Sequence, residues 1–437
     1  MKICVYGLWH LGSVTAACLA SVGHTVVGLD PDISTISSLS DGKAPIFEPG
    51  LDDLIKSGIA NATLSFDSDP ETALYDTNVL WVTFDTPVDD DDHADTTYVT
   101  NKILHVLPYL CEDTIILVSS QLPVGSIANL EQYALKNFVQ KNLCFAYSPE
   151  NLRLGKSLEV FLNPDRVIVG TRSGLELNEL QSLFLPLSNK IVWMRTESAE
   201  MTKHAINAFL AASVTFANEI ASICEVVGAD AKEVEFGLKT ESRIGPKAYL
   251  LPGAAFAGGT LARDVAFLGE LSLRNDLVTP LLSSVVVSND IHKTWVHRKL
   301  MQHFDSLKGV KVALWGLTYK AGTNTLRRSL AVELCDWLLN QQASVITYDP
   351  AVKVLPDRWS GKVLYTDDPV RASKDVDVLI IGTEWNEFKD LANQLANDGK
   401  RGLIIVDPNR HLFSLLTNFI GAGFSYIAVG SSTEVSC

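Results

Sequence analysis

Short apolar runs alternate with segments of helical periodicity along the first part of the chain. Six of these runs predict strands, at Ile3–Tyr6, Thr25–Leu29, Val79–Thr83, Thr114–Val118, Leu143–Tyr147 and Val167–Gly170. Helix-length segments lie between most of them. Apolar strands that alternate with helices are typical of a parallel sheet covered by helices on both faces.

The pattern changes between Glu197 and Val227, where apolar or small residues recur at helical spacing without an intervening Pro or Gly. They are Met201, Ala205, Ala208, Phe209, Ala212, Phe216 and Ile220. A helix of about 30 residues is about 45 Å long. Such a helix can join two domains and offer exposed faces to a homodimer interface, although a long helix buried within one subunit would give the same pattern.

The alternation resumes at Lys311. The predicted strands are Lys311–Trp315, Ser344–Tyr348, Asp377–Ile381, Leu403–Val406 and, at the end, Tyr426–Val429. The chain is therefore predicted to be an α/β protein with two Rossmann-like, doubly wound domains joined by a central long helix. We expect domains at residues 1–196, 197–296 and 297–437.

Composition narrows the range of partners. The net charge of −15 argues against nonspecific nucleic-acid binding, although a locally basic pocket could still take a phosphate-bearing ligand. The seven cysteines are scattered, which is typical of reduced thiols in the cytoplasm and not of a disulfide framework or metal site. The sequence shows neither a signal-peptide pattern nor an apolar run long enough for a membrane span. The acidic run Asp89–Asp92 is expected in a solvated loop.

The first strand leads into the turn Gly7–Gly12, of sequence G-L-W-H-L-G, and the next strand ends at Asp30. Strand, Gly-rich turn, helix, strand and acid form the dinucleotide-binding fingerprint, in which backbone N–H groups face a pyrophosphate. Asp30 can accept hydrogen bonds from both ribose hydroxyls and would repel a 2′-phosphate, so NAD is favoured over NADP. Trp9 replaces the middle glycine and must point its ring away. A tight turn without a ligand would give the same short motif.

Further short motifs follow in a fixed order. They are Asp85-Thr86-Pro87, Pro123-Val124-Gly125, Ser148-Pro149-Glu150, Asn163-Pro164-Asp165-Arg166, Lys203–Phe209, Arg243-Ile244-Gly245, Pro252-Gly253, Gly316–Lys320, Arg327-Arg328-Ser329, Tyr348-Asp349-Pro350 and Thr383-Glu384-Trp385. Their shared order resembles the UDP-glucose/GDP-mannose dehydrogenase family over nearly the whole chain. The resemblance implies an NAD-dependent enzyme that oxidises C6 of a nucleotide-linked hexose twice, through a thioester on a Cys. It assigns NAD to the first domain, dimerisation to the central one and the UDP-sugar to the last.

The resemblance also implies roles for single residues. Lys203 and Asn207 are spaced to share one helix face, where an ammonium and an amide can stabilise a developing alkoxide. Glu150 is the candidate general base, and Asp264 could activate or orient a water or Lys203. The expected cofactor contacts are Gly7, His10, Leu11, Gly12, Asp30, Thr86, Pro87, Gln121, Arg263 and Arg327. The expected substrate contacts are Tyr249, Gly253, Phe256, Lys320 and Arg243, the last reaching across a dimer.

Four positions depart from the family pattern. Thr260 occupies the position of the nucleophilic Cys in the segment Ala255–Asp264, and Arg263 replaces a Lys there. Leu154 replaces a second Glu, and Gln121 replaces a Thr. A free thiol has a pKa of about 8.5 and gives a strong nucleophile, whereas a threonine hydroxyl is far less acidic and is crowded by its methyl group. Thr260 is kept among the candidate catalytic residues, but the usual thioester route is in doubt.

Four functions remain open at this point. The enzyme could transfer one hydride, and stop at an aldehyde or ketone or oxidise, rearrange and reduce again. It could still make a uronic acid if an aldehyde hydrate loses the second hydride, with Glu150 or Asp264 deprotonating bound water. It could be a non-catalytic or regulatory nucleotide-sugar-binding protein. A dehydrogenase of β-hydroxy acids also pairs a Rossmann domain with a helical one, but the second α/β domain argues against it.

Overall fold

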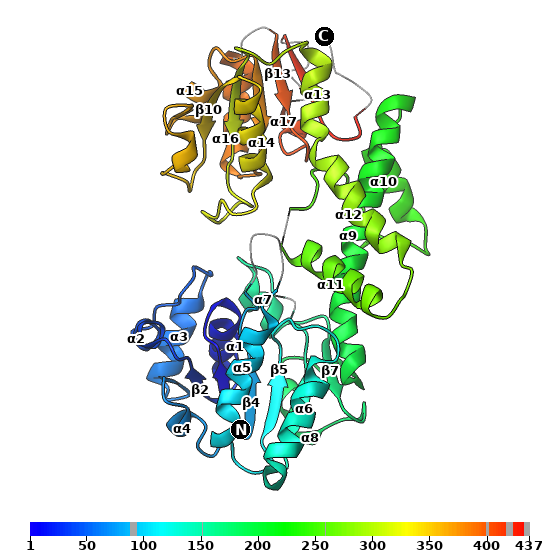
Figure 1. The fold of residues 1–437 in the computed structure, drawn as a ribbon. Helices are drawn as coiled ribbons and strands as arrows, with labels where there is room; N and C mark the ends of the chain where they lie inside the picture. Colours follow the sequence, from blue (N-terminus) through cyan, green and yellow to red (C-terminus); the bar gives the residue numbers. More distant parts are fainter. Residues whose placement is uncertain (88–93, 151, 258, 399–401, 417–422, 432–437) are drawn as a thin grey trace. The chain divides into compact units, whose positions relative to one another are not determined.

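The computed structural model describes residues 1–437 except 88–93, 151, 258, 399–401, 417–422 and 432–437. The acidic run Asp89–Asp92 lies outside the described residues. The chain forms two compact units, Met1–Ile206 and Asn207–Cys437 (Figure 1). Each unit has its own parallel sheet and its own core.

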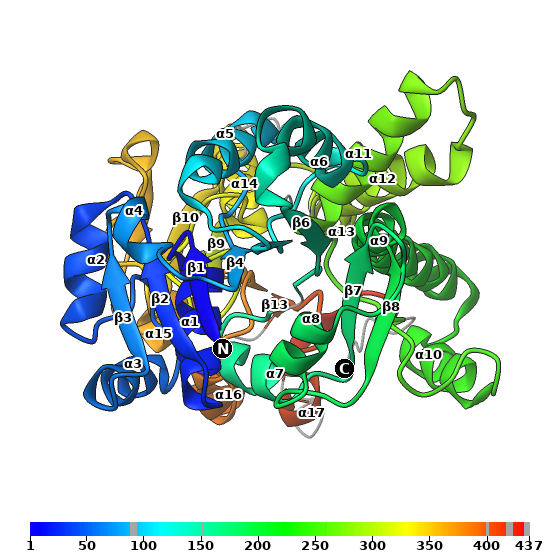
Figure 2. The same cartoon turned by 90° about the horizontal axis from the view of Figure 1, so that it is seen from below.

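The first unit is built on an eight-stranded sheet. Its strands are β1 Lys2–Tyr6, β2 Thr25–Leu29, β3 Leu64–Asp67, β4 Val79–Val82, β5 Ile115–Val118, β6 Cys144–Tyr147, β7 Val167–Thr171 and β8 Ile191–Arg195. Their order is β3-β2-β1-β4-β5-β6-β7-β8 (Figure 2). All neighbours are parallel except β6 and β7, which are antiparallel.

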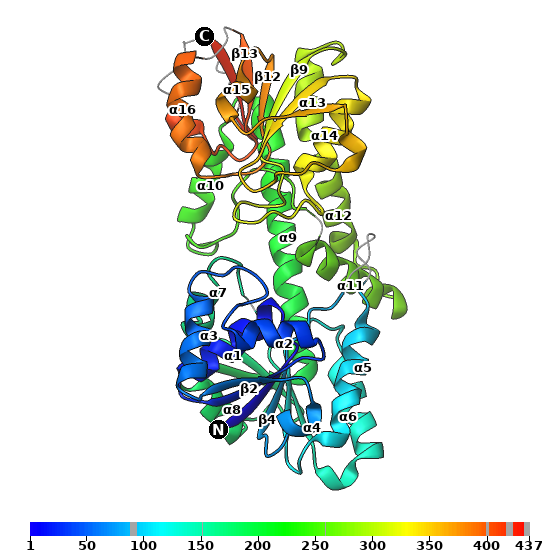
Figure 3. The same cartoon turned by 90° about the vertical axis from the view of Figure 1, so that its left-hand side faces the viewer.

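Helices cover both faces of this sheet. They are α1 His10–Ser21, α2 Ile33–Ser40, α3 Leu51–Ala60, α4 Pro70–Ala73, α5 Thr96–Val106, α6 Ser126–Asn137, α7 Ser157–Leu162 and α8 Asn178–Phe184, with short 3-10 turns η1 Leu107–Tyr109 and η2 Val139–Lys141. Because successive strand residues point to opposite sides, Ile3 and Val5 pack with α1, α3 and α8, whereas Cys4 and Tyr6 pack with α4, α5 and α6 (Figure 3). Each large apolar side chain buried in this way contributes roughly 1.5–3 kcal/mol.

The second unit has a six-stranded sheet. Its strands are β9 Lys311–Trp315, β10 Ser344–Tyr348, β11 Val363–Tyr365, β12 Val378–Ile381, β13 Leu403–Val406 and β14 Phe424–Ile427. The order is β11-β10-β9-β12-β13-β14, with all neighbours parallel. This is the strand order of β1 to β6 in the first unit.

The helices that follow α9 complete the second unit. They are α10 Ala231–Thr240, α11 Thr260–Arg274, α12 Pro280–Lys293, α13 Trp295–His303, α14 Leu330–Asn340, α15 Pro369–Ser373, α16 Glu387–Asp398 and α17 Phe413–Leu416, with the 3-10 turn η3 Asp357–Trp359. Val312 and Leu314 of β9 pack with α13 and α14, and Ala313 and Trp315 pack with α15, α16 and α17. The sheet is thus covered on both faces, as in the first unit.

The long helix α9 runs from Thr196 to Val227 and belongs to both units. Its length and its mean hydropathy of 1.4 over 18 residues would also suit a membrane span. However, two of its buried polar side chains bind backbone groups of the protein: Glu200 accepts the N–H of Gly125 and Asn218 accepts the N–H of Gly253. These contacts are those of a core helix.

The predicted fold class is confirmed: two doubly wound α/β domains are joined by a long helix. Three strands were not predicted, namely β3, β8 and β11, and each lies at a sheet edge. The last strand, β14, begins at Phe424 and not at Tyr426. The antiparallel β6–β7 pair departs from the expected parallel sheet, because the six residues of α7 do not form a full crossover helix between them.

Candidate functional site

The turn after β1 is tightly closed. Gly7 has a φ of +98°, and a Cβ at this residue would lie 2.7 Å from the ring of Phe84. A Cβ at Gly12 would lie 1.9 Å from the carbonyl oxygen of Gly7. The first turn of α1 is therefore packed directly against the end of β1. Its backbone N–H groups, which have no partner within the helix, lie where an anion can bind.

Trp9 occupies this turn without backbone strain. Its φ of −73° and ψ of −151° are open to any residue, and its side chain is 51% exposed. The loss of the middle glycine is thus compatible with the turn, and the ring faces solvent as predicted.

Asp30 lies beside the turn. Its carboxylate accepts the N–H of Leu8 at 2.7 Å and the N–H of Asp32 at 3.0 Å, and the residue is half-buried. A carboxylate has about four lone-pair positions, so two stay available for hydroxyl donors. A narrow glycine cradle followed by an accessible acid fits the pyrophosphate and a ribose of a dinucleotide.

The structure brings Thr86 and Gln121 together. Thr86 Oγ1 donates a hydrogen bond to the carbonyl oxygen of Gln121 at 2.5 Å. The two residues follow β4 and β5, so they lie at the carboxyl edge of the sheet. Thr86 is buried, whereas Pro87 is exposed at the same edge.

Two side chains of α9 that were not predicted contact the loop after β5. The carboxylate of Glu200 accepts the N–H groups of Gly125 and Ile127 at 2.8 and 3.1 Å. Burial raises the pKa of Glu200, and these two N–H groups oppose the rise. His204 Nε2 lies 3.0 Å from the carbonyl oxygen of Leu122. A Glu and a His one turn apart in an otherwise apolar helix were the only sequence signal for these contacts.

Lys203 and Glu150 meet in the first unit. Lys203 Nζ donates to the carbonyl oxygen of Glu150 at 2.6 Å and lies 3.7 Å from its Oε1. The Lys203 side chain is 8% exposed and that of Glu150 is 33% exposed. Glu150 Oε2 accepts the N–H of Leu152 at 2.7 Å. A buried ammonium is therefore placed beside a carboxylate that substrate can reach.

Asn207 and Asp264 meet in the second unit. Asn207 Nδ2 donates to Asp264 Oδ2, and both side chains are buried. Asp264 lies one turn after Thr260, the first residue of α11, which is exposed. The carboxylate fixes the orientation of the amide, and the hydroxyl at the start of the helix faces solvent. Arg263, between them in sequence, is half-buried.

The segment from Gly253 to Phe256 is fixed by side chains that sequence patterns did not reveal. The backbone of Gly253 is bound by Asn218 Oδ1 at 2.9 Å and by His292 Nε2 at 2.8 Å. The N–H and carbonyl groups of Phe256 are both paired with the amide of Asn289, at 2.9 and 2.8 Å. The predicted substrate segment is therefore rigid.

The remaining predicted residues lie at the surface of the second unit. Arg243 is paired with Glu241 at 2.9 Å, and its side chain is 86% exposed. Tyr249 is 56% exposed. Lys320 and Arg327 are exposed on the segment between β9 and α14. The grouping of these residues in one site stays a prediction.

Comparison with known proteins matches three successive parts of the chain to one family. The NAD binding domain of the UDP-glucose/GDP-mannose dehydrogenase family matches residues 1–188, the central domain matches 197–291, and the UDP binding domain matches 313–412. The chain belongs to the UDP-glucose/GDP-mannose dehydrogenase family. It is an NAD-dependent nucleotide-sugar dehydrogenase, and the predicted NAD cofactor is confirmed.

Relatives of this dehydrogenase align over nearly its full length. UDP-glucose 6-dehydrogenase of Rhizobium meliloti (strain 1021) is 32% identical over 98% of this chain and 99% of its own. UDP-glucose 6-dehydrogenase TuaD of Bacillus subtilis (strain 168) is also 32% identical, over 98% and 93%. Among solved structures, a UDP-glucose dehydrogenase from Pyrobaculum islandicum has a TM-score of 0.82 at 27% identity, covering 94% of this chain and 95% of that one.

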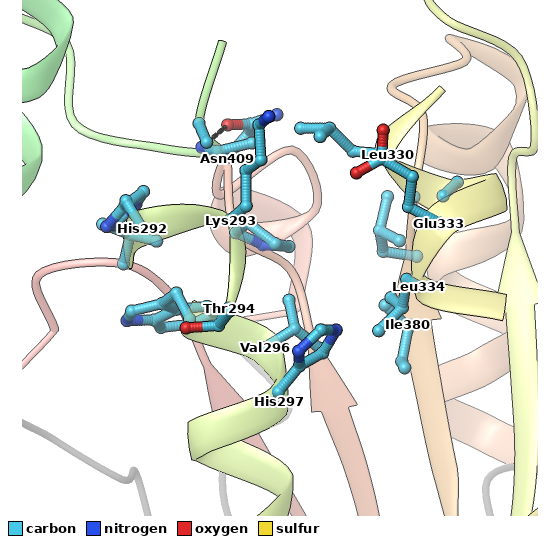
Figure 4. Close-up of a pocket in the computed structure, with 18 of the residues that line it drawn as sticks. His292, Lys293, Thr294, Val296, His297, Leu330, Glu333, Leu334, Ile380 and Asn409 are labelled. Atoms are coloured by element: carbon cyan, nitrogen blue, oxygen red, sulfur yellow. Dashed lines mark hydrogen bonds between the residues drawn. The ribbon is translucent and has the colours of Figure 1, made fainter. Parts of the chain in front are cut away.

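Each unit of this dehydrogenase contains a cavity. One, of about 80 Å³ in the first unit, is lined by Leu11 of α1 and by Glu150, among others. The second unit has a cavity of about 290 Å³ at the carboxyl ends of β12 and β13 (Figure 4). Its walls include Leu330, Leu334 and Ile380. Predicted site residues thus line the smaller cavity and not the larger.

Five of the described cysteines of this dehydrogenase do not provide an activated thiol. Burial raises the pKa of Cys18 and of Cys335 to about 12, and it also raises the pKa of Cys4, Cys144 and Cys224. These five thiols are therefore protonated at neutral pH, and none of them lies in the segment around Thr260.

Proposed function

We propose that this dehydrogenase oxidises C6 of a UDP-linked hexose, with UDP-glucose as the first substrate to test, and that it does so without a thioester. The observation that supports this most directly is the pair of buried contacts one turn apart on α9, Lys203 with Glu150 and Asn207 with Asp264. The relatives named UDP-glucose 6-dehydrogenase support the choice of sugar and of carbon.

Bound NAD supplies the acceptor for the hydride that leaves the carbinol carbon. The Lys203 ammonium donates a hydrogen bond to the carbinol oxygen and stabilises the alkoxide as its proton leaves. Asn207 has a second N–H on the nitrogen that Asp264 orients, and it donates to the same oxygen. Glu150, 3.7 Å from Lys203 Nζ, receives the proton as general base.

The other predicted residues divide between the two ligands. On the cofactor side we assign Gly7, His10, Leu11 and Gly12 to the pyrophosphate, Asp30 to a ribose, and Thr86, Pro87, Gln121, Arg263 and Arg327 to the remaining contacts. On the nucleotide-sugar side we assign Tyr249, Gly253, Phe256, Lys320 and Arg243. The rigid backbone at Gly253 and Phe256 supports a role in placing the sugar diphosphate.

Thr260 makes the active site atypical. Thr260 is exposed, and its β-branched hydroxyl is a much weaker nucleophile than a thiolate. The buried thiols of Cys18 and Cys335 are protonated and do not replace it. An aldehyde formed at C6 is therefore not trapped on the protein. If it adds water, the resulting hydrate can transfer its hydride to a second NAD and lose a proton to Glu150 or Asp264, which gives the carboxylic acid. The acid then releases a further proton to water and becomes the carboxylate.

The product is decided by stoichiometry. Limiting UDP-glucose is incubated with excess NAD, and NADH is counted for each sugar consumed. Two equivalents indicate a uronic acid formed through the hydrate, and one indicates an aldehyde that leaves the enzyme. Binding of both ligands by calorimetry, with neither NADH formation nor conversion of the sugar, would instead establish the regulatory, non-catalytic alternative. A sugar adduct seen by intact-protein mass spectrometry would overturn the route without a thioester.

The same proposal includes a homodimer. Phe209, Phe216 and Ile223 recur at heptad spacing on α9 and are 71%, 49% and 57% exposed. Three large apolar side chains in one exposed stripe are typical of a helix-to-helix interface. The exposed Arg243 is then available to the substrate of a second copy. We expect a dimer by light scattering at micromolar concentration and a monomer for the variant Phe216→Glu. A monomeric wild type would contradict this part of the proposal.

We place the enzyme in the cytoplasm, without a membrane or nucleic-acid partner. The net charge of −15 and the scattered, free thiols of the described cysteines support this location. Cell fractionation tests it.

A further inference from the structure

Glu48 is a buried carboxylate on the segment between α2 and α3, and it has four hydrogen-bond donors. Its Oε1 accepts the N–H of Ser157 at 2.9 Å. Its Oε2 accepts the N–H of Gly155 at 2.9 Å and the hydroxyl of Ser157 at 3.0 Å, and it lies 3.1 Å from His10 Nε2. The residue is 4% exposed. No sequence motif had indicated a role for it.

These donors come from two different parts of the first unit. His10 is the first residue of α1 and stands in the turn assigned to the pyrophosphate. Gly155 and Ser157 end the segment that starts at Ser148 and contains Glu150. One carboxylate therefore joins the cofactor turn to the segment that carries the proposed base.

The segment with Glu150 is fixed at both ends. At its start, the carbonyl oxygen of Ser148 accepts the hydroxyl of Ser119 at 2.6 Å, and the Ser148 hydroxyl donates to Ile168 at 2.8 Å. At its end, Glu48 accepts the backbone N–H groups of Gly155 and Ser157. The start is tied to the sheet, whereas the end is tied to a side chain that also binds the cofactor helix. A shift of α1 is thus transmitted to the end of the segment and not to its start.

The small cavity supports the same connection. Leu11 and Thr15 of α1 line it from one side, and Pro149, Glu150 and Leu152 line it from the other. Thr15 Oγ1 is buried without a hydrogen-bond partner. A cavity of about 80 Å³ therefore lies between the cofactor helix and the Glu150 segment, and a small shift of the helix can close it.

The folded protein favours the ionised form of Glu48. Burial alone would raise its pKa, but the hydrogen bonds from Gly155, Ser157 and His10 bring the pKa below the ordinary value. The cluster is not a hydrolytic triad, because His10 presents the same Nε2 to Ser157 and to Glu48, at 3.1 Å each. A structural and positioning role fits this geometry better than nucleophilic catalysis.

We propose that Glu48 is a positioning residue that couples dinucleotide binding at the His10 turn to the placement of Glu150 for the nucleotide sugar. The inference rests on the proposed function, since it takes Glu150 and the His10 turn as the substrate and cofactor sides of one site. Binding of the dinucleotide fixes His10, His10 fixes Glu48, and Glu48 fixes the end of the Glu150 segment. Occupancy of one site then raises affinity at the other.

The coupling is measured with NADH and UDP-glucose, a pair that does not turn over. Calorimetry gives the Kd of UDP-glucose for the full-length protein with and without saturating NADH. We expect NADH to lower this Kd roughly tenfold in the wild type, within the usual range of coupling between sites. In Glu48→Gln the amide places an N–H donor against one of the N–H groups, and the ratio should fall to about one. The Kd of UDP-glucose without NADH should change less than about twofold.

A matched control separates this effect from the loss of any buried carboxylate. Glu235 on α10 is 6% exposed and is paired with Lys232 and Lys239, each at 2.6 Å. Glu235→Gln should keep the wild-type ratio. If Glu48→Gln does not fold, His10→Ala removes the contacts of His10 with Glu48 and with the Ser157 hydroxyl, and it should abolish the coupling while the N–H groups of Gly155 and Ser157 stay bound to Glu48. The Kd of NADH is measured for this variant as well, so that the ratio is taken at saturating NADH.

The outcomes distinguish the two levels of the proposal. A wild type that binds neither NADH nor UDP-glucose contradicts the proposed function itself. A wild type that binds both without coupling, or a Glu48→Gln protein that retains the coupling, overturns the positioning role and leaves the proposed function intact. A lower kcat at saturating substrates in Glu48→Gln, with unchanged KM for UDP-glucose, would show a role in catalysis and not in coupling.

Discussion

The two units have the same strand order but differ at the turn that follows the first central strand. In the first unit, β1 ends at Tyr6, Gly7 turns the chain with a φ of +98°, and α1 begins at His10. In the second unit, β9 ends at Trp315 and Gly316 turns the chain with a φ of +87°, but α14 begins only at Leu330. The same sheet edge thus has a tight turn in one unit and a long segment in the other.

The acids that follow the second strand differ in the same way. Asp30 accepts two backbone N–H groups and is half-buried, so it can still bind a ligand. Asp349 accepts four, from Leu317, Thr318, Ala351 and Val352 at 2.6 to 3.2 Å, and is fully buried. Asp30 therefore keeps acceptor positions for a ribose, whereas Asp349 only closes the turn.

From this difference we propose that the strand order makes the edge and that the connecting segment selects the ligand. A helix that starts at the turn offers backbone N–H groups to a pyrophosphate. Where the helix starts later, side-chain cations take that place, and the segment of the second unit carries Lys320, Arg327 and Arg328. We therefore propose that the first unit holds the dinucleotide and that the second unit anchors the nucleotide sugar.

The largest effect is expected for Lys203→Ala, which tests whether the first unit performs the chemistry. Loss of the ammonium that stabilises the alkoxide should lower kcat by at least about 10³-fold, or roughly 4 kcal/mol in the barrier. The Kd of NADH, measured by fluorescence, should stay within about twofold of wild type. The exposed Lys190 provides the control, since Lys190→Ala should leave both quantities unchanged. Near-normal turnover in Lys203→Ala would remove this residue from the mechanism.

A crossed pair of substitutions tests the contrast between the two acids. Asp349→Ala leaves four N–H groups without an acceptor and should lower the free energy of unfolding by at least about 3 kcal/mol. Asp30→Ala should cost less than about 1 kcal/mol of stability but raise the Kd of NADH roughly tenfold. Urea unfolding followed by tryptophan fluorescence measures stability, because Trp315 and Trp359 are buried in the second unit. Equal losses of unfolding free energy in the two variants would show that the two acids contribute equally to stability, which would contradict the contrast.

Most of the fold follows from periodicity because the central strands are buried on both faces. The burial of β4 and β5 is continuous, and both strands were predicted. The missed strands β3, β8 and β11 are edge strands whose residues are mostly half-buried, so they lack a continuous apolar run. Edge strands have a neighbour on one side only, and the sequence alternation that would mark them is short.

The site was predicted less completely than the fold. The placement of Asp30, Thr86 and Gln121 at one sheet edge follows from motifs that end strands. By contrast, Glu48 and Glu200 act through backbone N–H groups distant in sequence, and such contacts leave no spacing to recognise. The motifs indicated the residues that we propose to face ligands, whereas the residues that hold those motifs in place required three-dimensional contacts.

The smallest effect concerns acid stability and again compares a carboxylate in each unit. The pKa of Glu48 is lowered from 4.5, because its hydrogen bonds outweigh the rise from burial. Its ionised form therefore stabilises the folded state fully above pH 4.5, and this stabilisation is lost as the pH falls through the lowered pKa of the folded state. Glu48→Gln has no such dependence, so its difference from wild type in unfolding free energy should shrink in acid, by on the order of 1 kcal/mol.

Asp336 in the second unit provides the comparison for this titration. Burial alone would raise the pKa of Asp336, but hydrogen bonds from Arg358 and Trp359 outweigh this effect and bring the pKa below its ordinary value. The Asp336 side chain is 38% exposed. Because solvent screens an exposed pair, the difference between wild type and Asp336→Asn should change less with pH than the difference for Glu48→Gln. Urea unfolding at pH 7 and at about pH 3.5 measures both. A Glu48→Gln difference that stays constant between these values would mean that the carboxylate is not charged in the folded protein, and the contacts with His10, Gly155 and Ser157 would then have to be explained by a neutral acid.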